Sequence, residues 1–320
     1  MRNTLNFQPD TFQQEQNPNS EANKMVGSTL PRRALGRLLR ELRKKSQKSQ
    51  LSAGLAIDMS PPSINRLEAG QRVKISTPQF SALLDLYAAS ADQRAQVLAL
   101  VEETKATKGD PKGGWWRAYS DVVGSHFDHY MGLEEVCNRF TAFQLTLLPG
   151  LLQTPEYRRS MIVTNDPDMS GVDIERRIEL ATRRQARIQE GDTFLVDVLL
   201  SESVLRHQIG GPAVMSDQLI HLTEVGQMSN VSIRVVPHSV GSYLGLIAQS
   251  FILLEFPPLR DRGLIEPPVI FIEEWEGALF LEEDKAIQRH RNAVADIRRV
   301  ALDEDASRQL LVGFAKEYSA

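Results

Sequence analysis

Leu35 to Gly70 reads LGRLLRELRKKSQKSQLSAGLAIDMSPPSINRLEAG, and this stretch decides the fold of the first part of the chain. Its opening segment, about 32–45, repeats leucine at helical spacing, which predicts an amphipathic helix. The leucines are Leu35, Leu38, Leu39 and Leu42. A second helix is predicted over about 50–57. Asp58 follows it at a tight turn, where we expect a left-handed backbone, which Asp tolerates better than most residues do.

A third helix is predicted directly after this turn. Ser60 suits the N-cap, and Pro61 suits the first helical position. Apolar side chains at 64 and 67 would point inward, which leaves the polar residues between them for the surface. A tight turn followed by a short helix with a polar outer face is typical of a helix-turn-helix, whose second helix enters the DNA major groove. The competing interpretation is a plain helical bundle.

These residues resemble the lambda-repressor-like family, also called XRE or Cro/C1 type. The resemblance lies in Gln50 at the start of the second helix, in the turn 57–60 and in the segment 64–70, INRLEAG. It implies that Gln50 supports the recognition helix and touches the DNA backbone. It also implies that Arg43 and Glu68 form a buried or half-buried ion pair that braces the first helix against the third.

Pro61 and Pro62 depart from the family pattern, because related proteins often place base-contacting polar side chains there, and proline donates no hydrogen bond. We therefore expect the residues that follow to read the bases, with Arg66 able to contact guanine through two hydrogen bonds. The predicted DNA-binding set is Lys48, Gln50, Ser60, Ser63, Asn65, Arg66 and Arg72. The segment 32–48 holds eight basic residues and one acid, Glu41, and we interpret it as phosphate-contacting rather than only solvated.

The charge of the chain is unevenly distributed. The net charge is −4 over 320 residues, yet residues 28–108 carry 14 Lys and Arg against 7 Asp and Glu. Residues 109–320 carry 21 against 31. A basic domain joined to an acidic one is typical of a DNA-binding head on a body that does not bind DNA.

The sequence indicates a cytoplasmic, nucleoid-associated protein without a membrane partner. The N-terminus is polar and lacks an apolar signal core, and no run of eighteen apolar residues occurs. The single cysteine, Cys137, cannot form an internal disulfide and fits a buried helix face.

Composition divides the chain into four parts. Residues 1–27 are rich in Asn and Gln and are predicted to be a disordered tail. Residues 28–103 form the helix-turn-helix domain, in which Thr77 is expected to cap a fourth helix and a fifth helix spans 91–103. The segment 104–114 is a linker by composition. Residues 115–320 form the second domain, so the fold class is mainly α followed by α+β, with a five-helix head and a small sheet flanked by helices.

Hydrophobic patterns place the elements of this second domain. Helices are predicted at about 127–130, 132–143, from 155, 173–190, 212–226, 284–302 and 307–318. Strands are predicted at 194–200, 231–236, 250–256, 269–274 and 278–281. Thr154 should cap the helix that begins at Pro155. The arginines of the helix 173–190 alternate with acids and are interpreted as a solvated face.

Several segments of this domain resemble the effector half of actinobacterial XRE regulators of the WhiJ type. They are GWWRAY (114–119), LLPGLLQTPEY (147–157), the charged helix and the Val-Pro-His strand end. The resemblance implies an antitoxin-like regulator, often encoded beside a small partner protein, whose C-terminal domain modulates DNA-bound regulation.

No known catalytic signature occurs, so we expect no enzymatic activity and no cofactor. His126 and His129, with Asp128 between them, lack a third strong ligand, and no metal site is predicted.

The favoured function is a transcription regulator that binds an inverted-repeat operator as a homodimer, with half-sites about 34 Å apart, and is controlled by a small protein partner. One alternative gives the second domain a small-molecule pocket with Trp115, Trp116, Tyr243 and Trp275 as the candidate residues, which are equally candidates for a partner surface. Another makes that domain an enzyme. Acidic residues at 273–276 and 282–284 indicate either a solvated strand edge or a docking face for a basic partner.

Overall fold

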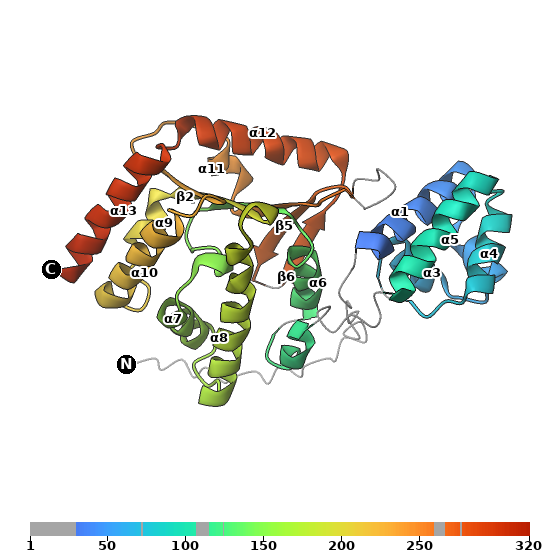
Figure 1. Ribbon diagram of the computed structural model, residues 1–320, viewed down its shortest axis with the longest axis horizontal. Coiled ribbons are helices and arrows are strands. Elements are labelled where there is room, and N and C mark those ends of the chain that lie inside the picture. Colours follow the sequence, from blue (N-terminus) through green and yellow to red (C-terminus); the bar gives the residue numbers. More distant parts are fainter. Residues whose placement is uncertain (1–29, 72, 107–114, 124, 259–265, 276) are drawn as a thin grey trace, which may run out of the picture.

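The computed structural model describes residues 30–71, 73–106, 115–123, 125–258, 266–275 and 277–320. The predicted tail and most of the predicted linker therefore lie outside the described residues. The head and the C-terminal domain are separate helical and α+β bodies (Figure 1). No helix among the described residues is long and apolar enough to cross a membrane.

The head contains five described helices in the order that the sequence predicts. They are α1 (Leu30–Lys45), α2 (Gln50–Ala56), α3 (Pro61–Glu68), α4 (Thr77–Leu86) and α5 (Ala91–Ala106). Asp58, between α2 and α3, has a φ of 53°, the left-handed conformation that its position requires. One cap differs from the prediction: Ser76 and not Thr77 is the N-cap of α4. Ser76 and Gln79 form a capping box, so Thr77 is already helical.

Among the described residues, one six-stranded mixed sheet forms the centre of the C-terminal domain. Its strands are β1 (Arg139–Gln144), β2 (Leu195–Ser201), β3 (Val231–Val236), β4 (Phe251–Glu255), β5 (Val269–Glu274) and β6 (Gly277–Leu281). The order across the sheet is β3-β2-β1-β4-β5-β6. β1, β2 and β3 are parallel, with Phe140 opposite Val196, and the remaining neighbours are antiparallel.

Helices cover both faces of this sheet. The longer ones are α6 (Ser125–Glu134), α7 (Pro155–Asn165), α8 (Gly171–Gln185), α10 (Pro212–Val225), α12 (Asp284–Val300) and α13 (Glu304–Ser319). Shorter ones are η2 (Trp115–Tyr119), η3 (Gly150–Leu152), η4 (Ala186–Thr193), α9 (Glu202–Arg206) and α11 (Gly245–Ala248). α12 lies along one face of the sheet, and α6, α7, α9, α10 and α13 contribute to the core on the other (Figure 1).

Two predicted helices of this domain are wrong in part. The predicted helix 132–143 is the end of α6 followed by strand β1, whose inner residues are all buried. β1 pairs with neighbours on both sides and so becomes the third of six strands, which removes the alternation that marks a half-exposed strand. The predicted helix 173–190 is α-helical only to Gln185 and continues as the 3-10 helix η4.

The head and the C-terminal domain meet at the first turns of α1. Leu30 is buried in the core cluster of the C-terminal domain. Arg33 is also buried; its Nε lies 3.1 Å from Glu266 Oε1 and its Nη1 lies 2.9 Å from Glu282 Oε1. Arg37 Nη1 lies 2.9 Å from the same Glu266 oxygen. We call these four charged residues the domain joint.

Candidate nucleic-acid interface

The outer face of α3 is polar and exposed. Asn65 and Arg66 are exposed and Ser63 is half-buried, while Ile64 and Leu67 of the same helix are buried in the core of the head. Arg66 Nη2 donates to Ser63 Oγ at 3.0 Å. Ser60 occupies the N-cap position but makes no capping bond with its side chain; its Oγ lies 3.0 Å from Ser63 Oγ instead. These four polar residues therefore share one surface.

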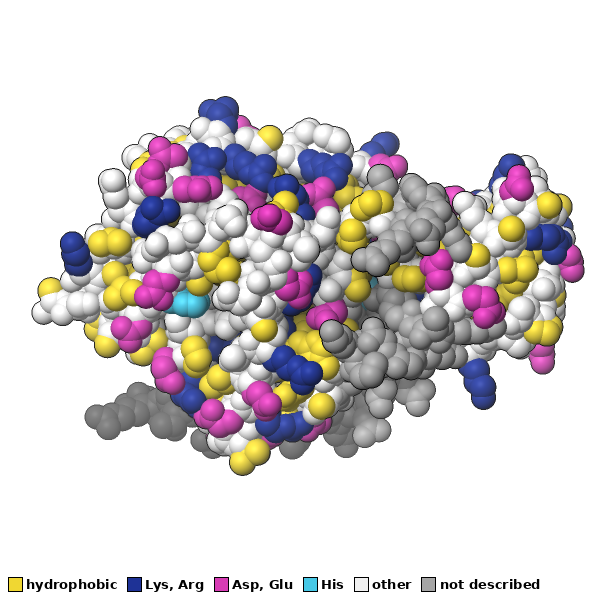
Figure 2. Space-filling model, viewed as in Figure 1, with side chains coloured by type: hydrophobic (Ala, Val, Ile, Leu, Met, Phe, Trp, Pro, Cys, Tyr) yellow, Lys and Arg dark blue, Asp and Glu magenta, His cyan; other side chains and the backbone are white. Residues whose placement is uncertain are grey.

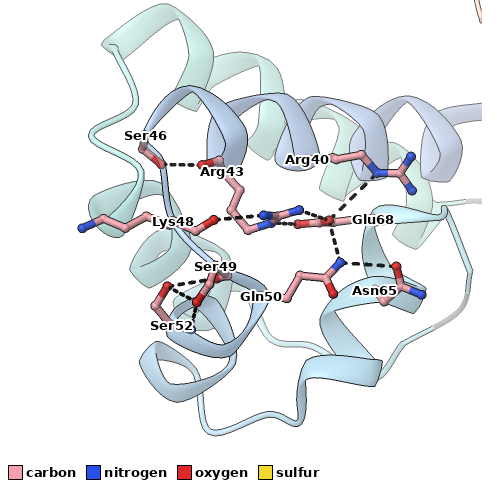
Figure 3. Close-up of polar contacts among 9 residues, drawn as sticks. All are labelled: Arg40, Arg43, Ser46, Lys48, Ser49, Gln50, Ser52, Asn65 and Glu68. Carbon is pink, nitrogen blue, oxygen red and sulfur yellow. Dashed lines mark hydrogen bonds and ion pairs between the residues drawn. The ribbon is translucent and has the colours of Figure 1, made fainter.

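A buried carboxylate anchors α3 to α1 (Figure 3). Glu68 is 4% exposed and accepts two hydrogen bonds from Arg43, at 2.5 Å from Nε and 2.8 Å from Nη2. The hydrogen bond with Glu68 raises the pKa of Arg43 above its ordinary value. Arg40 Nε lies 3.9 Å from the same carboxylate. Two guanidinium groups thus compensate one buried charge, which fixes the orientation of α3.

The same network reaches α2 and the loop before it. Gln50 Nε2 donates to Glu68 Oε2 at 3.2 Å and to Asn65 Oδ1 at 3.3 Å, so α2 is joined to the outer face of α3. Arg43 Nη1 donates to the Lys48 carbonyl at 2.9 Å, while the Lys48 side chain points away from the network (Figure 3). Ser49 caps α2 by accepting from Ser52 N. Hydrogen bonds within the head therefore fix the positions of α2 and α3, which carry most of the predicted DNA-facing residues.

The basic residues of the segment 32–48 do not all face the same way, and some form ion pairs inside the protein. This corrects the expectation of one phosphate-contacting face. Arg33 and Arg37 face Glu266 at the domain joint, and Arg43 faces Glu68. Exposed positions remain at Lys44, Lys45 and Lys48. Sequence cannot separate these roles, because the acids that bind Arg33 and Arg37 lie more than 200 residues further along. Arg72, also predicted to bind DNA, lies outside the described residues.

The four aromatic candidates of the C-terminal domain are not brought together. Trp115 and Trp116 pack edge to face within η2, with ring centroids 6.0 Å apart. Tyr243 packs against Phe143 on the α12 face of the sheet. Trp275 is 87% exposed between β5 and β6. The contacts of the described residues therefore do not bring these four side chains together at one ligand site.

Charged residues inside the C-terminal domain were missed by the sequence analysis. Arg184, expected on a solvated face, is buried and donates to Glu134 from Nε at 2.8 Å and from Nη2 at 2.7 Å. Neighbouring Arg187 lies over the ring of Phe194 at 4.0 Å. The seven-residue spacing of Arg177 and Arg184 was the available signal, because it places both on the same face of α8 as the buried Ala181.

His129 is buried and packs edge to face on Phe280, with ring centroids 4.5 Å apart. Burial, and secondarily the positive charge of Arg33, lower the pKa of His129 to about 4. Within the part of the chain that the structure describes, no group of three or more His, Cys, Asp or Glu residues is arranged to hold a metal ion.

An exposed polar helix after a tight turn, braced by a buried Arg–Glu pair, defines a helix-turn-helix DNA-binding protein. A family model described as a helix-turn-helix domain matches residues 34–97, and one described as a domain of unknown function (DUF5753) matches residues 127–312. The chain belongs to this DUF5753 family, and the resemblance found in the sequence is confirmed for a helix-turn-helix joined to a C-terminal domain of unknown function. No curated protein and no solved structure matches the chain.

Proposed function

We propose that the chain is a sequence-specific transcription regulator that inserts α3 into the major groove and binds an inverted-repeat operator as a homodimer. The observation that carries this proposal is the outer face of α3, where exposed Asn65 and Arg66 stand on a helix immobilised by buried Glu68. A guanidinium held in place loses less conformational entropy when it contacts a base, which favours readout of sequence.

The short reading surface supports dimeric binding. The first two positions of α3 are proline, so direct base contacts fall to three side chains, Ser63, Asn65 and Arg66. Each good base contact contributes about 1–3 kcal/mol of discrimination. Two copies on one operator would double that number, and helix-turn-helix dimers read half-sites one helical turn apart.

We further propose that a small, basic protein controls the regulator through its C-terminal domain. Trp275 projects beside Glu273 and Glu274, which are also exposed. Tryptophan is a common anchor of protein interfaces, and the acids beside Trp275 would attract a cationic partner. We propose that the protein acts in the cytoplasm and needs no cofactor. We also propose that it is not an enzyme, since the sequence holds no known catalytic motif.

The test is a binding titration on the full-length protein. An operator selected from random duplexes is compared with a half-site duplex of equal length, and light scattering gives the mass of the complex. We expect an inverted repeat, a two-to-one complex and much weaker binding of the half-site. Equal affinity for both duplexes, or a one-to-one complex, would contradict the dimer; failure to select any sequence would contradict sequence-specific binding.

Partner control is tested separately, by purifying the tagged protein from its native cells. We expect a small basic protein to co-purify with the wild type and to be lost with Trp275→Ala, while DNA binding by the isolated variant is unchanged. Trp116→Ala is not a suitable control because Trp116 is buried, whereas the exposed Leu279→Ala on β6 is. Equal recovery with Trp275→Ala would contradict this docking surface.

A further inference from the structure

A cavity of about 250 Å³ lies in the C-terminal domain, between α6, α7 and α8. Part of its wall is apolar and includes Phe127, Ile162 and Leu180. Three arginines, Arg158, Arg177 and Arg184, make most of the polar wall, which also includes Asn165 and Glu273. Basic and hydrophobic side chains also lie next to one another on the surface between α8 and α6 (Figure 2). None of the aromatic residues expected to line a ligand pocket belongs to this cavity.

Arg158 is the unusual member of this wall. Its Nε atom is buried and has no hydrogen-bond partner. Its Nη2 donates only a long hydrogen bond, 3.4 Å, to the carbonyl of Gly150, and no acid of the described chain forms an ion pair with it. Burial and the nearby charge of Arg184 lower the pKa of Arg158 to about 10. Arg158 as a whole is half-buried, and a guanidinium with a buried, unpaired nitrogen and no ion-pair partner is costly to the fold.

The other two arginines of the cavity differ in how far their positive charge is compensated. Arg184 is compensated by Glu134 through two hydrogen bonds. Arg177 donates from Nε to the carbonyl of Val122, but no described acid forms an ion pair with it. The cavity therefore has an excess of positive charge, which Glu273 at its wall only partly offsets.

The absence of a side chain at Gly150 leaves room for the arginines near the cavity. A Cβ atom at Gly150 would lie 2.7 Å from Arg158 Nη2 and 3.4 Å from Arg184 Nη1. Any larger residue would therefore push the Arg158 guanidinium away from the loop, while Arg184 would stay at ordinary contact distance. Positively charged side chains therefore surround the cavity, and a glycine leaves room for them. We expect this arrangement of an anion site that a ligand completes.

We propose that this cavity binds a small organic anion, a carboxylate or phosphate ester with an apolar body. Its anionic group would accept hydrogen bonds from Arg158 and Arg177, and its apolar part would pack on Phe127, Ile162 and Leu180. The guanidinium fork matches two oxygens of either anion. Pockets for drug-sized ligands occupy about 300–1,000 Å³, so this cavity suits a smaller molecule. The proposal goes beyond DNA binding and does not depend on it.

The binding test uses the full-length protein with three probes of one size: benzoate, phenyl phosphate and uncharged benzamide. We expect benzoate or phenyl phosphate at millimolar concentration to raise the melting temperature, and benzamide to leave it unchanged. Calorimetry should show that Arg158→Gln weakens binding of the active probe about tenfold or more. Arg159→Gln is the matched control, because Arg159 is the next residue on α7 but pairs with Glu156 and Glu175 outside the cavity.

Each outcome decides a specific point. A shift with benzoate alone identifies a carboxylate site, and a shift with phenyl phosphate alone identifies a phosphate site. If neither anion raises the melting temperature, or if benzamide does so equally, the proposal is overturned. Binding that Arg158→Gln leaves unchanged would overturn it as well, and so would an equal loss of binding in Arg159→Gln.

A second variant tests the site without any ligand. Arg158→Met keeps the length of the side chain and removes the uncompensated charge, so the melting temperature of the ligand-free protein should rise. A charge that only a ligand compensates destabilises the empty site, whereas an arginine that stabilises the fold lowers the melting temperature when it is replaced. A fall in the melting temperature would therefore contradict the assignment of Arg158 to a ligand.

Discussion

We expect base recognition to depend most on the side chain of Arg66. It is exposed on α3 and its guanidinium is oriented by Ser63. We expect Arg66→Ala to cost about 1–3 kcal/mol on the specific operator and to relax base preference at one position. Titrations against the operator and its single-base variants measure both effects. Arg94→Ala is the control, because Arg94 is a half-buried arginine of α5 that pairs with Asp85. An unchanged base preference in Arg66→Ala would contradict the role of α3.

Lys48 should act on DNA without reading its sequence. Its carbonyl accepts a hydrogen bond from Arg43, but its side chain is exposed beside the start of α2. We expect Lys48→Ala to weaken binding to all sequences alike and to reduce the slope of log affinity against log salt by about one. Titrations at several salt concentrations on specific and random duplexes give this slope. A loss confined to one operator would point to base contact instead.

At the scale of elements, the head depends on the close approach of α1 and α3. A Cβ atom at Gly36 would lie 2.5 Å from the Leu67 carbonyl oxygen and 2.8 Å from Gly70 N. Gly36→Ala should therefore force the helices apart and destabilise the head by about 1–3 kcal/mol, as measured by urea unfolding followed by circular dichroism. It should also weaken DNA binding, because Glu68 would lose its position against Arg43.

Gly313 provides the matched control for this substitution. It lies within α13, and a Cβ atom there would meet nothing within 4 Å. Gly313→Ala should stabilise the protein by up to about 1 kcal/mol, since alanine loses less backbone entropy in a helix. Equal effects of the two substitutions would show that helix propensity, and not the contact between α1 and α3, governs position 36.

Local patterns predicted most elements, and non-local pairing explains the failures. The strands β3 and β5 have the bounds that the sequence indicates, because alternation in β3 and a short apolar run after two prolines in β5 define them locally. β1 was predicted as helix because Leu133, Val136, Cys137 and Phe140 have helical spacing, although they span the end of α6 and the start of a strand. Which strands lie beside β1 depends on segments more than 50 residues away, and no local window contains that information.

The same distinction holds for the candidate site. The reading face of α3 could be predicted because its caps, turn and core positions fall within one short segment. Arg33, Arg158 and Arg184 could not be assigned, because each is defined by what surrounds it after folding. Sequence shows that an arginine is present, but only the packed structure shows whether an acid, a carbonyl or an empty space faces it.

At the scale of the whole molecule, His129 makes stability depend on pH. Its pKa is about 4 in the folded protein against 6.5 in the unfolded chain, so the unfolded chain binds the proton first as pH falls. We expect the free energy of unfolding to decrease by about 2 kcal/mol between pH 7 and pH 5 from this residue. Urea titrations at both pH values measure it.

The variant His129→Phe isolates this contribution, because it retains an aromatic ring against Phe280 and cannot be protonated. Burial raises the pKa of Glu266 at the same joint, which makes its contribution change with pH in the opposite direction. The difference between wild type and variant removes that background. His207→Gln, at an exposed position, should leave the pH dependence of the wild type intact. An equally steep decrease in His129→Phe would contradict this account.

The domain joint should also constrain which operators the proposed dimer can accept. Leu30 is buried in the C-terminal core, and Arg33 forms ion pairs with Glu266 and Glu282. Rotating the head against the C-terminal domain would therefore expose apolar surface and leave a buried charge without a partner. If the C-terminal domains hold the dimer together, the two recognition helices keep a fixed separation and phase. Inserting a single base pair between the half-sites would rotate one of them away from its helix, and such a regulator would tolerate changes of base more readily than changes of spacing.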